Sequence, residues 1–210
     1  MSPTGESQDE FRAIVGAYAG AGDESERARL ESRLWARFGC EGTVLVTDMC
    51  GFSAATRQRG ICHFLGLIER ARAIVDGHVR RAGGRLVKFE VDNGFALFDE
   101  PDAAFDACRG IDAGWRHASP VTDGDIVLSL GLDHGRLLLV GGGEFFGDPV
   151  NTASKLAEDL AGRGEVLASR AVIERLRRQD DLVLDPRVAR LSGIEIEYSR
   201  VEFLHQGTRR

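Results

Sequence analysis

Hydrophobic and polar residues alternate along this chain with two different periods. In residues 59–81, apolar side chains recur every three or four positions, which is the pattern of a helix with one buried face. Shorter apolar runs flank that segment, and Asn93-Gly94 between two of them is typical of a hairpin turn. The main elements are therefore expected in this order: strand 43–49, helix 59–81, strands 85–91 and 94–99, helix 101–116, strands 126–133 and 136–141, helix 149–161, strand 165–168 and helix 169–178, with one or two further strands between 182 and 206.

This order indicates an α+β fold with a ferredoxin-like βαββαβ core. Two helical stretches, 8–20 and 24–38, precede the core, and the glycine-containing segment 39–42 is expected to form a break after them. We therefore expect an N-terminal helical extension over residues 1–41 and a main domain over residues 42–210.

Composition narrows the possible functions. The 210 residues, 43% of them hydrophobic, are enough for one globular domain with a full core and a modest extension. A net charge of -6 argues against a nucleic-acid-binding surface. The four cysteines form no C-x-x-C pair, so we expect reduced thiols and a cytoplasmic protein. No apolar run approaches the roughly 20 residues of a membrane helix, so no membrane partner is expected.

Two aspartates stand where predicted strands end. Asp48 follows an apolar run and precedes a turn of small residues, and Asp92 closes a second run directly before Asn93-Gly94. Carboxylates on neighbouring strand ends can share divalent cations, which take oxygen ligands and usually carry substrate phosphates as well. The turn after Asp48 also offers main-chain N–H groups near a helix start, where phosphate oxygens bind readily. These positions indicate a site for a metal ion and a phosphorylated ligand.

Around these aspartates, the chain resembles the catalytic domain of the class III nucleotidyl cyclases, the adenylate and guanylate cyclase family. The resemblance covers about residues 42–178 and has five landmarks in the family's order. They are Asp48-Met49-Cys50-Gly51-Phe52-Ser53, Lys88 four residues before Asp92, a bend between two strands from Gly131 to Gly135, Gly147-Asp148-Pro149-Val150-Asn151-Thr152-Ala153, and a small-residue strand from Gly164 to Ser169. The resemblance implies a catalytic domain over residues 42–210 that makes cyclic AMP and pyrophosphate from ATP in signal transduction.

The same resemblance implies a metal site and a phosphate-binding turn. Members of the family use two metal ions in each active site, usually Mg²⁺ or Mn²⁺. The matching metal-site positions are Asp48, Met49 and Asp92, and the turn that would bind the phosphates of the nucleoside triphosphate comprises Cys50, Gly51, Phe52 and Ser53.

Four further positions match residues that bind the base, the ribose and the α-phosphate. Lys88 matches the lysine that reads the base in adenylate cyclases, and Glu144 falls where those enzymes have an Asp or Thr for the adenine amino group. Asn151 matches the asparagine that orients the ribose. Lys155 stands four residues later, on the same predicted helix face, where the family usually has an arginine. In the family, the metal residues and the base-reading residues come from different subunits, so the resemblance implies a homodimer.

The sequence departs from the family at two cations. Lys155 can supply charge but not the planar, bidentate fork of an arginine. The family's Lys-Gly segment near the C-terminus corresponds here to the acidic stretch 191–197, which contains no lysine. Two alternatives therefore remain open. One is a cyclase for another nucleotide, such as GTP or a pyrimidine nucleotide, the latter giving cyclic UMP or CMP in antiviral signalling. The other is a degenerate domain that binds a nucleotide or only dimerises.

Overall fold

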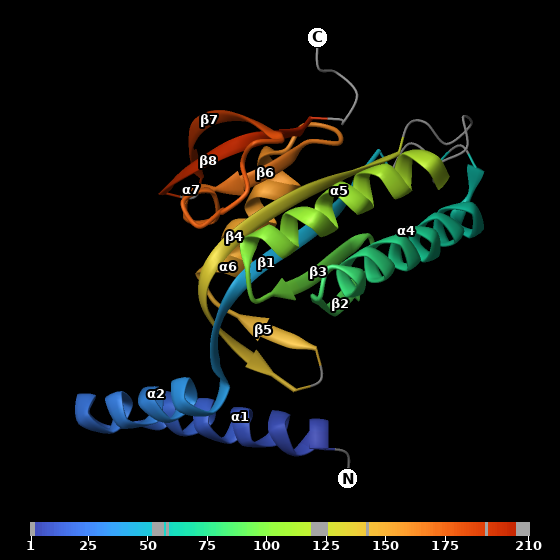
Figure 1. Cartoon of the computed structure of the whole chain (residues 1–210). Coiled ribbons are helices and arrows are strands. Elements are labelled where there is room, and N and C mark those ends of the chain that lie inside the picture. Colours follow the sequence, from blue (N-terminus) through green and yellow to red (C-terminus); the bar gives the residue numbers. More distant parts are fainter. Residues whose placement is uncertain are drawn as a thin grey trace.

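The computed structural model describes residues 3–51, 57, 59–118, 126–141, 143–191 and 193–204. Its centre is an eight-stranded sheet in the order β2-β3-β1-β4-β6-β8-β7, with β5 paired to β4 (Figure 1). The strands are β1 Gly39–Cys50, β2 Arg85–Glu90, β3 Asn93–Phe98, β4 Val127–Val140, β5 Glu144–Phe146, β6 Val166–Ser169, β7 Leu182–Leu191 and β8 Ile194–Phe203.

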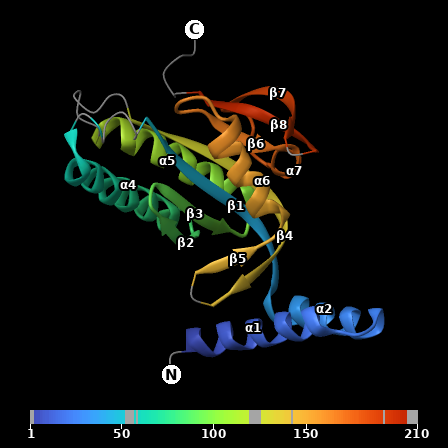
Figure 2. The same ribbon diagram turned by 180° about the vertical axis from the view of Figure 1, so that it is seen from behind.

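The first four strands and two helices form the predicted βαββαβ core. The helices are α4, Ile61–Arg81, and α5, Pro101–Ala118, and both cover one face of the sheet. The short helix α6, Asp148–Ser154, lies on the other face, as the reverse view shows (Figure 2). Neighbouring residues of β1 point to opposite faces: Leu45 packs with α4 and α5, whereas Val44 packs on the α6 side. The α+β, ferredoxin-like fold is therefore confirmed.

The predicted bend between two strands at Gly131–Gly135 is wrong, because β4 runs without interruption from Val127 to Val140. Gly131 has a different role in the fold. A Cβ atom there would lie 2.2 Å from the carbonyl oxygen of Ala153 and 2.6 Å from the nitrogen of Ala157. Only a glycine lets the helix backbone approach the sheet this closely. The small residue thus fixes the position of the helix that carries Asn151.

The hairpin between β2 and β3 also differs from the prediction. Glu90 pairs with Asn93, so the turn consists of Val91 and Asp92, and Asn93-Gly94 already belongs to β3. Val91 has a φ of 53°, and it is the one non-glycine residue with positive φ in the described part of the chain. A β-branched residue is strained in this conformation. The strain lies directly before Asp92.

Three other boundaries were predicted incorrectly. β1 starts at Gly39 without a break, because the long strand β4 offers pairing partners as far as Leu138. The predicted helix 169–178 is a single turn, α7, at Arg170–Ile173, after which the chain turns towards β7. The predicted helix 149–161 changes its winding after Ser154: residues Lys155–Leu160 form a π-helix, η2, which is rare and is frequently found at functional sites.

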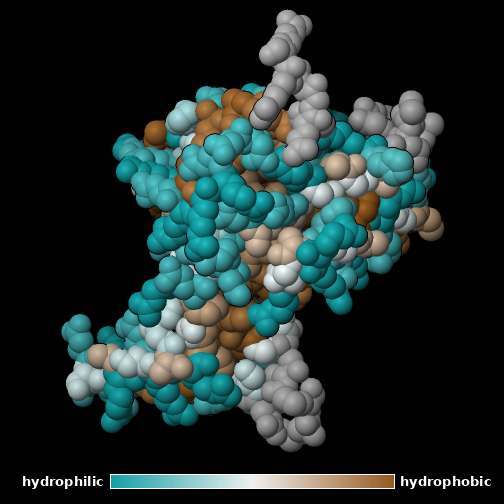
Figure 3. Space-filling view, in the orientation of Figure 1, coloured by the Kyte–Doolittle hydropathy of each residue, from teal (hydrophilic) through white to brown (hydrophobic). Residues whose placement is uncertain are grey.

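The N-terminal residues form two helices, α1 at Pro3–Gly20 and α2 at Glu24–Phe38, which lie at one end of the molecule (Figure 1). Asp23 caps α2 by accepting a hydrogen bond from the main-chain nitrogen of Glu26 at 2.8 Å. Ile14 and Phe38 are buried against the end of β4. A band of hydrophobic residues is visible between this helix pair and the body of the protein (Figure 3). The functional division at residue 42 stays a prediction.

Among the described residues, no helix is long and apolar enough to cross a membrane.

Candidate active site

Strand pairing brings the two predicted metal-binding aspartates together. Thr47 of β1 pairs with Gly94 of β3, so Asp48 lies next to the turn that carries Asp92. The hydroxyl of Thr47 also accepts a hydrogen bond from the main-chain nitrogen of Gly94 at 3.0 Å, which fixes this register. Burial raises the pKa of Asp48 above its ordinary value, and the charge of Asp92 raises it further, whereas a hydrogen bond from Cys50 lowers it. The two carboxylates are thus close enough to repel each other.

A small polar network supports Asp48 from the side of β4. The Cys50 thiol donates to the Asp48 carboxylate at 3.4 Å and contacts the Ser129 hydroxyl at 3.1 Å. Ser129 in turn donates to the carbonyl oxygen of Gly162 at 3.0 Å. Burial is the main cause that raises the pKa of Cys50. Cys50 is therefore a neutral hydrogen-bond donor that orients Asp48.

The predicted phosphate-binding turn is described only in part. Met49 is buried in the core, so its side chain is no ligand and only its main-chain carbonyl could bind a metal ion. Gly51 turns the chain out of β1 with a φ of 92°. Phe52 and Ser53 lie outside the described residues.

The donor atoms at Asp48 and Asp92 fit a hard divalent cation. The charge of Asp92 raises the pKa of Asp48, and a cation bound between the two carboxylates would remove this repulsion. The side-chain oxygen of Asn93, beside Asp92, is buried and accepts no hydrogen bond within the described part of the chain. That same part contains no group of three acidic, His or Cys side chains arranged around a metal position. Mg²⁺ is commonly bound by one or two carboxylates together with substrate phosphates, which agrees with this donor set.

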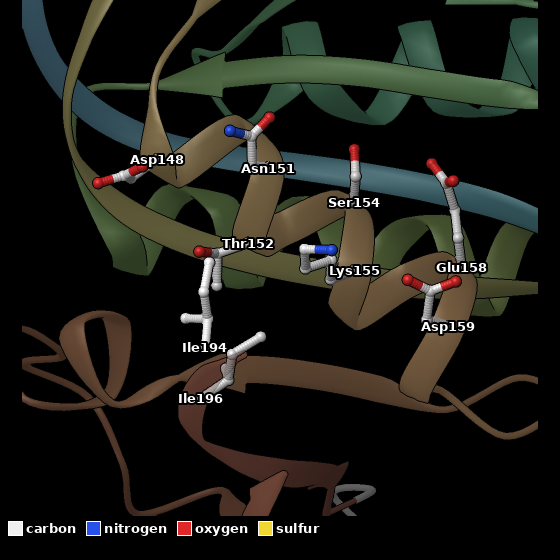
Figure 4. Close-up of a pocket in the computed structure, with 9 residues that line it drawn as sticks. All are labelled: Asp148, Asn151, Thr152, Ser154, Lys155, Glu158, Asp159, Ile194 and Ile196. Atoms are coloured by element: carbon white, nitrogen blue, oxygen red, sulfur yellow. The ribbon is translucent and has the colours of Figure 1, made fainter. Parts of the chain in front are cut away.

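Asn151 and Lys155 line one cavity, of about 580 Å³, between the α6–η2 element and β8. Figure 4 shows Asn151 pointing towards β1, in a row with Ser154 and Glu158. Lys155 lies on the side of Ile194 and Ile196. The two predicted catalytic side chains therefore reach the cavity from adjacent sides of the element, and not from the single helix face that their spacing predicts.

A buried carboxylate anchors the start of this element. Asp133 of β4 is 8% exposed and accepts hydrogen bonds from the Ser169 hydroxyl, the Thr152 hydroxyl and the main-chain nitrogen of His134. Burial raises its pKa, and these hydrogen bonds lower it. Because Thr152 is adjacent to Asn151, Asp133 helps to fix the orientation of the predicted ribose-binding residue.

The two predicted base-reading residues, Lys88 and Glu144, lie on neighbouring elements. A Cβ atom on Gly143 would be 4.0 Å from the Cβ of Lys88. Glu144 is the next residue, so its backbone lies close to that lysine. The Lys88 ammonium pairs with Glu90 at 3.0 Å and lies 4.7 Å from the centre of the Phe95 ring. Both residues are half-buried. The structure thus brings this pair together, separately from the aspartates.

Glu158 is a residue that the sequence reasoning missed. It accepts a hydrogen bond from the side-chain amide of Asn93 at 3.0 Å. Burial raises the pKa of Glu158, and the charges of Asp48, Asp159 and Asp92 raise it further. Its position seven residues after Asn151, which is two helical turns on the same face, is the one signal that could have identified it.

The acidic C-terminal stretch contributes apolar side chains to this region. Ile194 and Ile196 line the cavity beside Lys155, while Glu195 pairs with Arg190 at 3.3 Å. The described part of this stretch therefore offers no cation where the family has its lysine.

Several solved structures of cyclase catalytic domains share this arrangement of strands and helices. The guanylate cyclase domain of RhGC from Catenaria anguillulae, solved in complex with GTP, superposes with a TM-score of 0.68 at 18% identity, over 79% of this chain and 97% of that chain. The adenylate/guanylate cyclase/hydrolase from Silicibacter pomeroyi gives a TM-score of 0.64 at 22% identity, over 80% and 98% of the two chains. The chain has the fold of a nucleotidyl cyclase catalytic domain.

The likeness extends to adenylyl cyclases. The adenylyl cyclase CyaB from P. aeruginosa has a TM-score of 0.66 at 16% identity, over 80% of this chain and 97% of that one. Domains named for either purine nucleotide therefore share the fold, and the fold does not select between them. No protein-family model and no curated protein matches the sequence.

Proposed function

We propose that this protein is a nucleotidyl cyclase that converts ATP to 3′,5′-cyclic AMP and pyrophosphate in a homodimer. The observation that carries the proposal is the pairing of β1 with β3, which places Asp48 beside the Asp92 turn in a cyclase fold. In the reaction, the ribose 3′-oxygen attacks the α-phosphorus, the bond to the β-phosphate breaks, and the hydroxyl proton leaves to solvent. Divalent cations bound by the two carboxylates would lower the pKa of the 3′-hydroxyl and neutralise the triphosphate.

We assign roles to the other site residues from their positions in the fold. Asn151 holds the ribose by hydrogen bonds from its amide. Lys155 supplies positive charge to the α-phosphate as negative charge develops there. The main-chain N–H groups of the turn around Cys50 and Gly51 bind phosphate oxygens. Lys88 and Glu144 contact the base, where the Glu144 carboxylate can accept a hydrogen bond from an exocyclic amino group.

A homodimer completes the site in this proposal. Asn151 is exposed on the isolated chain, so a partner can reach it. Large apolar side chains are also exposed, with Ile61 at 57%, Leu65 at 52% and Val91 at 67%. Adjacent exposed apolar side chains are often covered by another protein surface, and Ile61 and Leu65 lie one turn apart on α4.

Cyclisation of a different nucleotide is the second candidate. It is favoured by the contacts of Lys88, whose ammonium is already paired with Glu90, and by the carboxylate at position 144. The Lys88–Glu90 pair and the Glu144 carboxylate are each compatible with a base other than adenine.

One assay tests both candidates. The purified protein is incubated with Mn²⁺ and each of the four nucleoside triphosphates, and the products are identified by mass spectrometry. Cyclic AMP with pyrophosphate is the expected product, and Asp48→Ala is the matched negative control. If a different cyclic nucleotide forms, the second candidate is correct. If none of the four nucleotides gives a cyclic product, the proposed function is overturned.

A further inference from the structure

The turn that carries Asp92 is held from outside its own hairpin. The amide nitrogen of Asn93 donates a hydrogen bond at 3.0 Å to Glu158, which lies 65 residues further along the chain on η2. Figure 4 shows the Glu158 side chain, which also lines the cavity, pointing in the same direction as those of Asn151 and Ser154, towards β1. The contact therefore joins the π-helix to the residue that follows the predicted metal ligand.

The same turn is strained. Val91 holds a φ of 53° with its side chain 67% exposed, so no burial of this side chain compensates the strain. A strained backbone conformation persists where surrounding contacts fix it. Asn93 directly follows this turn, and its side chain reaches another element, where Glu158 is its partner.

We propose that the Asn93–Glu158 contact is a positioning device that holds the strained turn so that Asp92 faces Asp48 and binds the metal ion. Glu158 is then a positioning residue that acts through Asn93, and it need not touch the ion. This role agrees with the described residues, in which Asp48, Asp92 and Glu158 do not surround one metal position. The inference rests on the proposed function, because that function gives Asp92 its metal ion.

Glu158, the partner of Asn93, lies within the π-helix η2. An α-helix that continued past Ser154 would turn by about 100° per residue, whereas a π-helix turns less per residue. The change of winding therefore alters the direction of every side chain from Lys155 onwards. The π-helix begins three residues before Glu158 and ends two residues after it.

The test measures Mn²⁺ affinity without turnover, by the electron paramagnetic resonance signal of free Mn²⁺ during titration of the metal alone. The Mn²⁺ binding that wild type shows and Asp48→Ala lacks is the binding at the proposed metal site. Glu158→Ala and Asn93→Ala should each weaken site binding by roughly 10-fold, the scale of a lost partner behind a metal ligand. The double variant should be no weaker than either single variant, because both remove the same contact.

Two further variants separate positioning from charge and from misfolding. Glu158→Gln keeps an oxygen that accepts from Asn93, so its affinity should lie closer to wild type than to Glu158→Ala. Val91→Gly relieves the strain, since glycine takes positive φ readily, and should restore most of the affinity lost in Glu158→Ala. Glu31→Gln, which removes one charge from the exposed surface of α2, should bind Mn²⁺ like wild type.

The outcomes distinguish this inference from the proposed function. Equal Mn²⁺ affinity of wild type and Glu158→Ala overturns the inference and leaves the proposed function intact if wild type makes a cyclic nucleotide. A Glu158→Gln variant as weak as Glu158→Ala also overturns it, because charge alone would then explain the effect. Weaker binding in Glu158→Ala, together with no cyclic product from wild type, supports the positioning device and overturns the proposed function.

Discussion

The carboxylate end and the base-reading end of the candidate site are built on different parts of the sheet. Asp48 lies on β1, which is hydrogen-bonded on both sides, by β3 and β4. Lys88 lies on β2, which is an edge strand of the sheet, next to an irregularity in its pairing after Leu86. Glu144 begins β5, a strand of three residues. Under the proposed function, the chemistry is fixed by the centre of the sheet, whereas nucleotide choice depends on an edge that can vary with less effect on the fold.

The largest expected effect is at the carboxylate end. Asp48→Ala or Asp92→Ala should lower turnover by at least about 10³-fold, since charge stabilisation by a metal ion is worth several kcal/mol. Product formation with Mn²⁺ measures this loss, and circular dichroism checks the fold. Asp180→Ala, at an exposed position after α7, is the control and should keep wild-type turnover. Wild-type turnover in either site variant would remove the carboxylates from the mechanism.

Mixing of variants tests whether the site is shared between subunits. Asp92→Ala and Asn151→Ala, each inactive alone, should regain up to about one quarter of wild-type activity in an equal mixture, because half of the symmetric dimers would be mixed and each would have one intact site of two. Asp48→Ala mixed with Asp92→Ala should stay inactive, because both aspartates of a site come from one subunit, so each of the two sites would lack one of them. No recovery in demonstrated mixed dimers would contradict a shared site.

Lys155 should have the next largest effect. Lys155→Ala should lower turnover by roughly 10²-fold, the scale of one lost transition-state donor. Lys155→Arg should retain or raise turnover, because a guanidinium suits phosphate oxygens. Steady-state kinetics with the preferred nucleotide measure both values. Unchanged kcat and KM in Lys155→Ala would indicate that this side chain only lines the cavity.

The base-reading end should control selectivity more than rate. Lys88→Met or Glu144→Gln should change the ratio of kcat/KM between two nucleotides by roughly 10-fold, the scale of one hydrogen bond to a charged group. Competition assays with pairs of nucleoside triphosphates measure that ratio. An equal loss of kcat/KM with all nucleotides would instead indicate that these residues stabilise the fold of the β2–β5 region.

The smallest expected effect is on stability, and it follows from the raised pKa of Asp48. The folded protein binds this proton more tightly than the unfolded chain, so ionisation lowers the free energy of unfolding as pH rises through the folded-state pKa. Without metal, Asp48→Asn should therefore melt higher than wild type at neutral pH, by roughly 2–4 °C for each kcal/mol of repulsion removed. Thermal melts should show this difference shrinking as pH falls. Added Mn²⁺ should reverse the difference in melting temperature, because it binds to and stabilises wild type only.

The sequence predicted the site positions that depend on strand ends. Asp48 and Asp92 follow apolar runs of strand length, and pairing of those runs suffices to bring the carboxylates together. The β2–β3 turn was misplaced because Asn93-Gly94 is a strong local turn signal, whereas tertiary contacts hold Val91 at positive φ instead.

Contacts between distant segments explain the other failures. The continuity of β4 depends on its pairing with β1 over twelve residues, and local glycines at 131 and 135 give no sign of it. The helix backbone approaches the sheet closely at Gly131, and both the π-helix and the Asn93–Glu158 contact lie on this same element. No local pattern encodes such an approach, so neither feature could be predicted.

Under the proposed function, the helix pair at the N-terminus has a mechanical consequence for nucleotide choice. The Phe11 ring of α1 stacks on Phe146 of β5, with ring centres 5.4 Å apart, and Ser7 accepts a hydrogen bond from the Gly141 nitrogen at 3.3 Å. Glu144 lies between those two points of attachment, on the same short hairpin. A force that displaces α1 therefore acts on the chain within three residues of Glu144. It reaches Asp48 only through the length of the central strands. Under the proposed function, residues ahead of the core are thus coupled to the base-reading end before they are coupled to the carboxylate end.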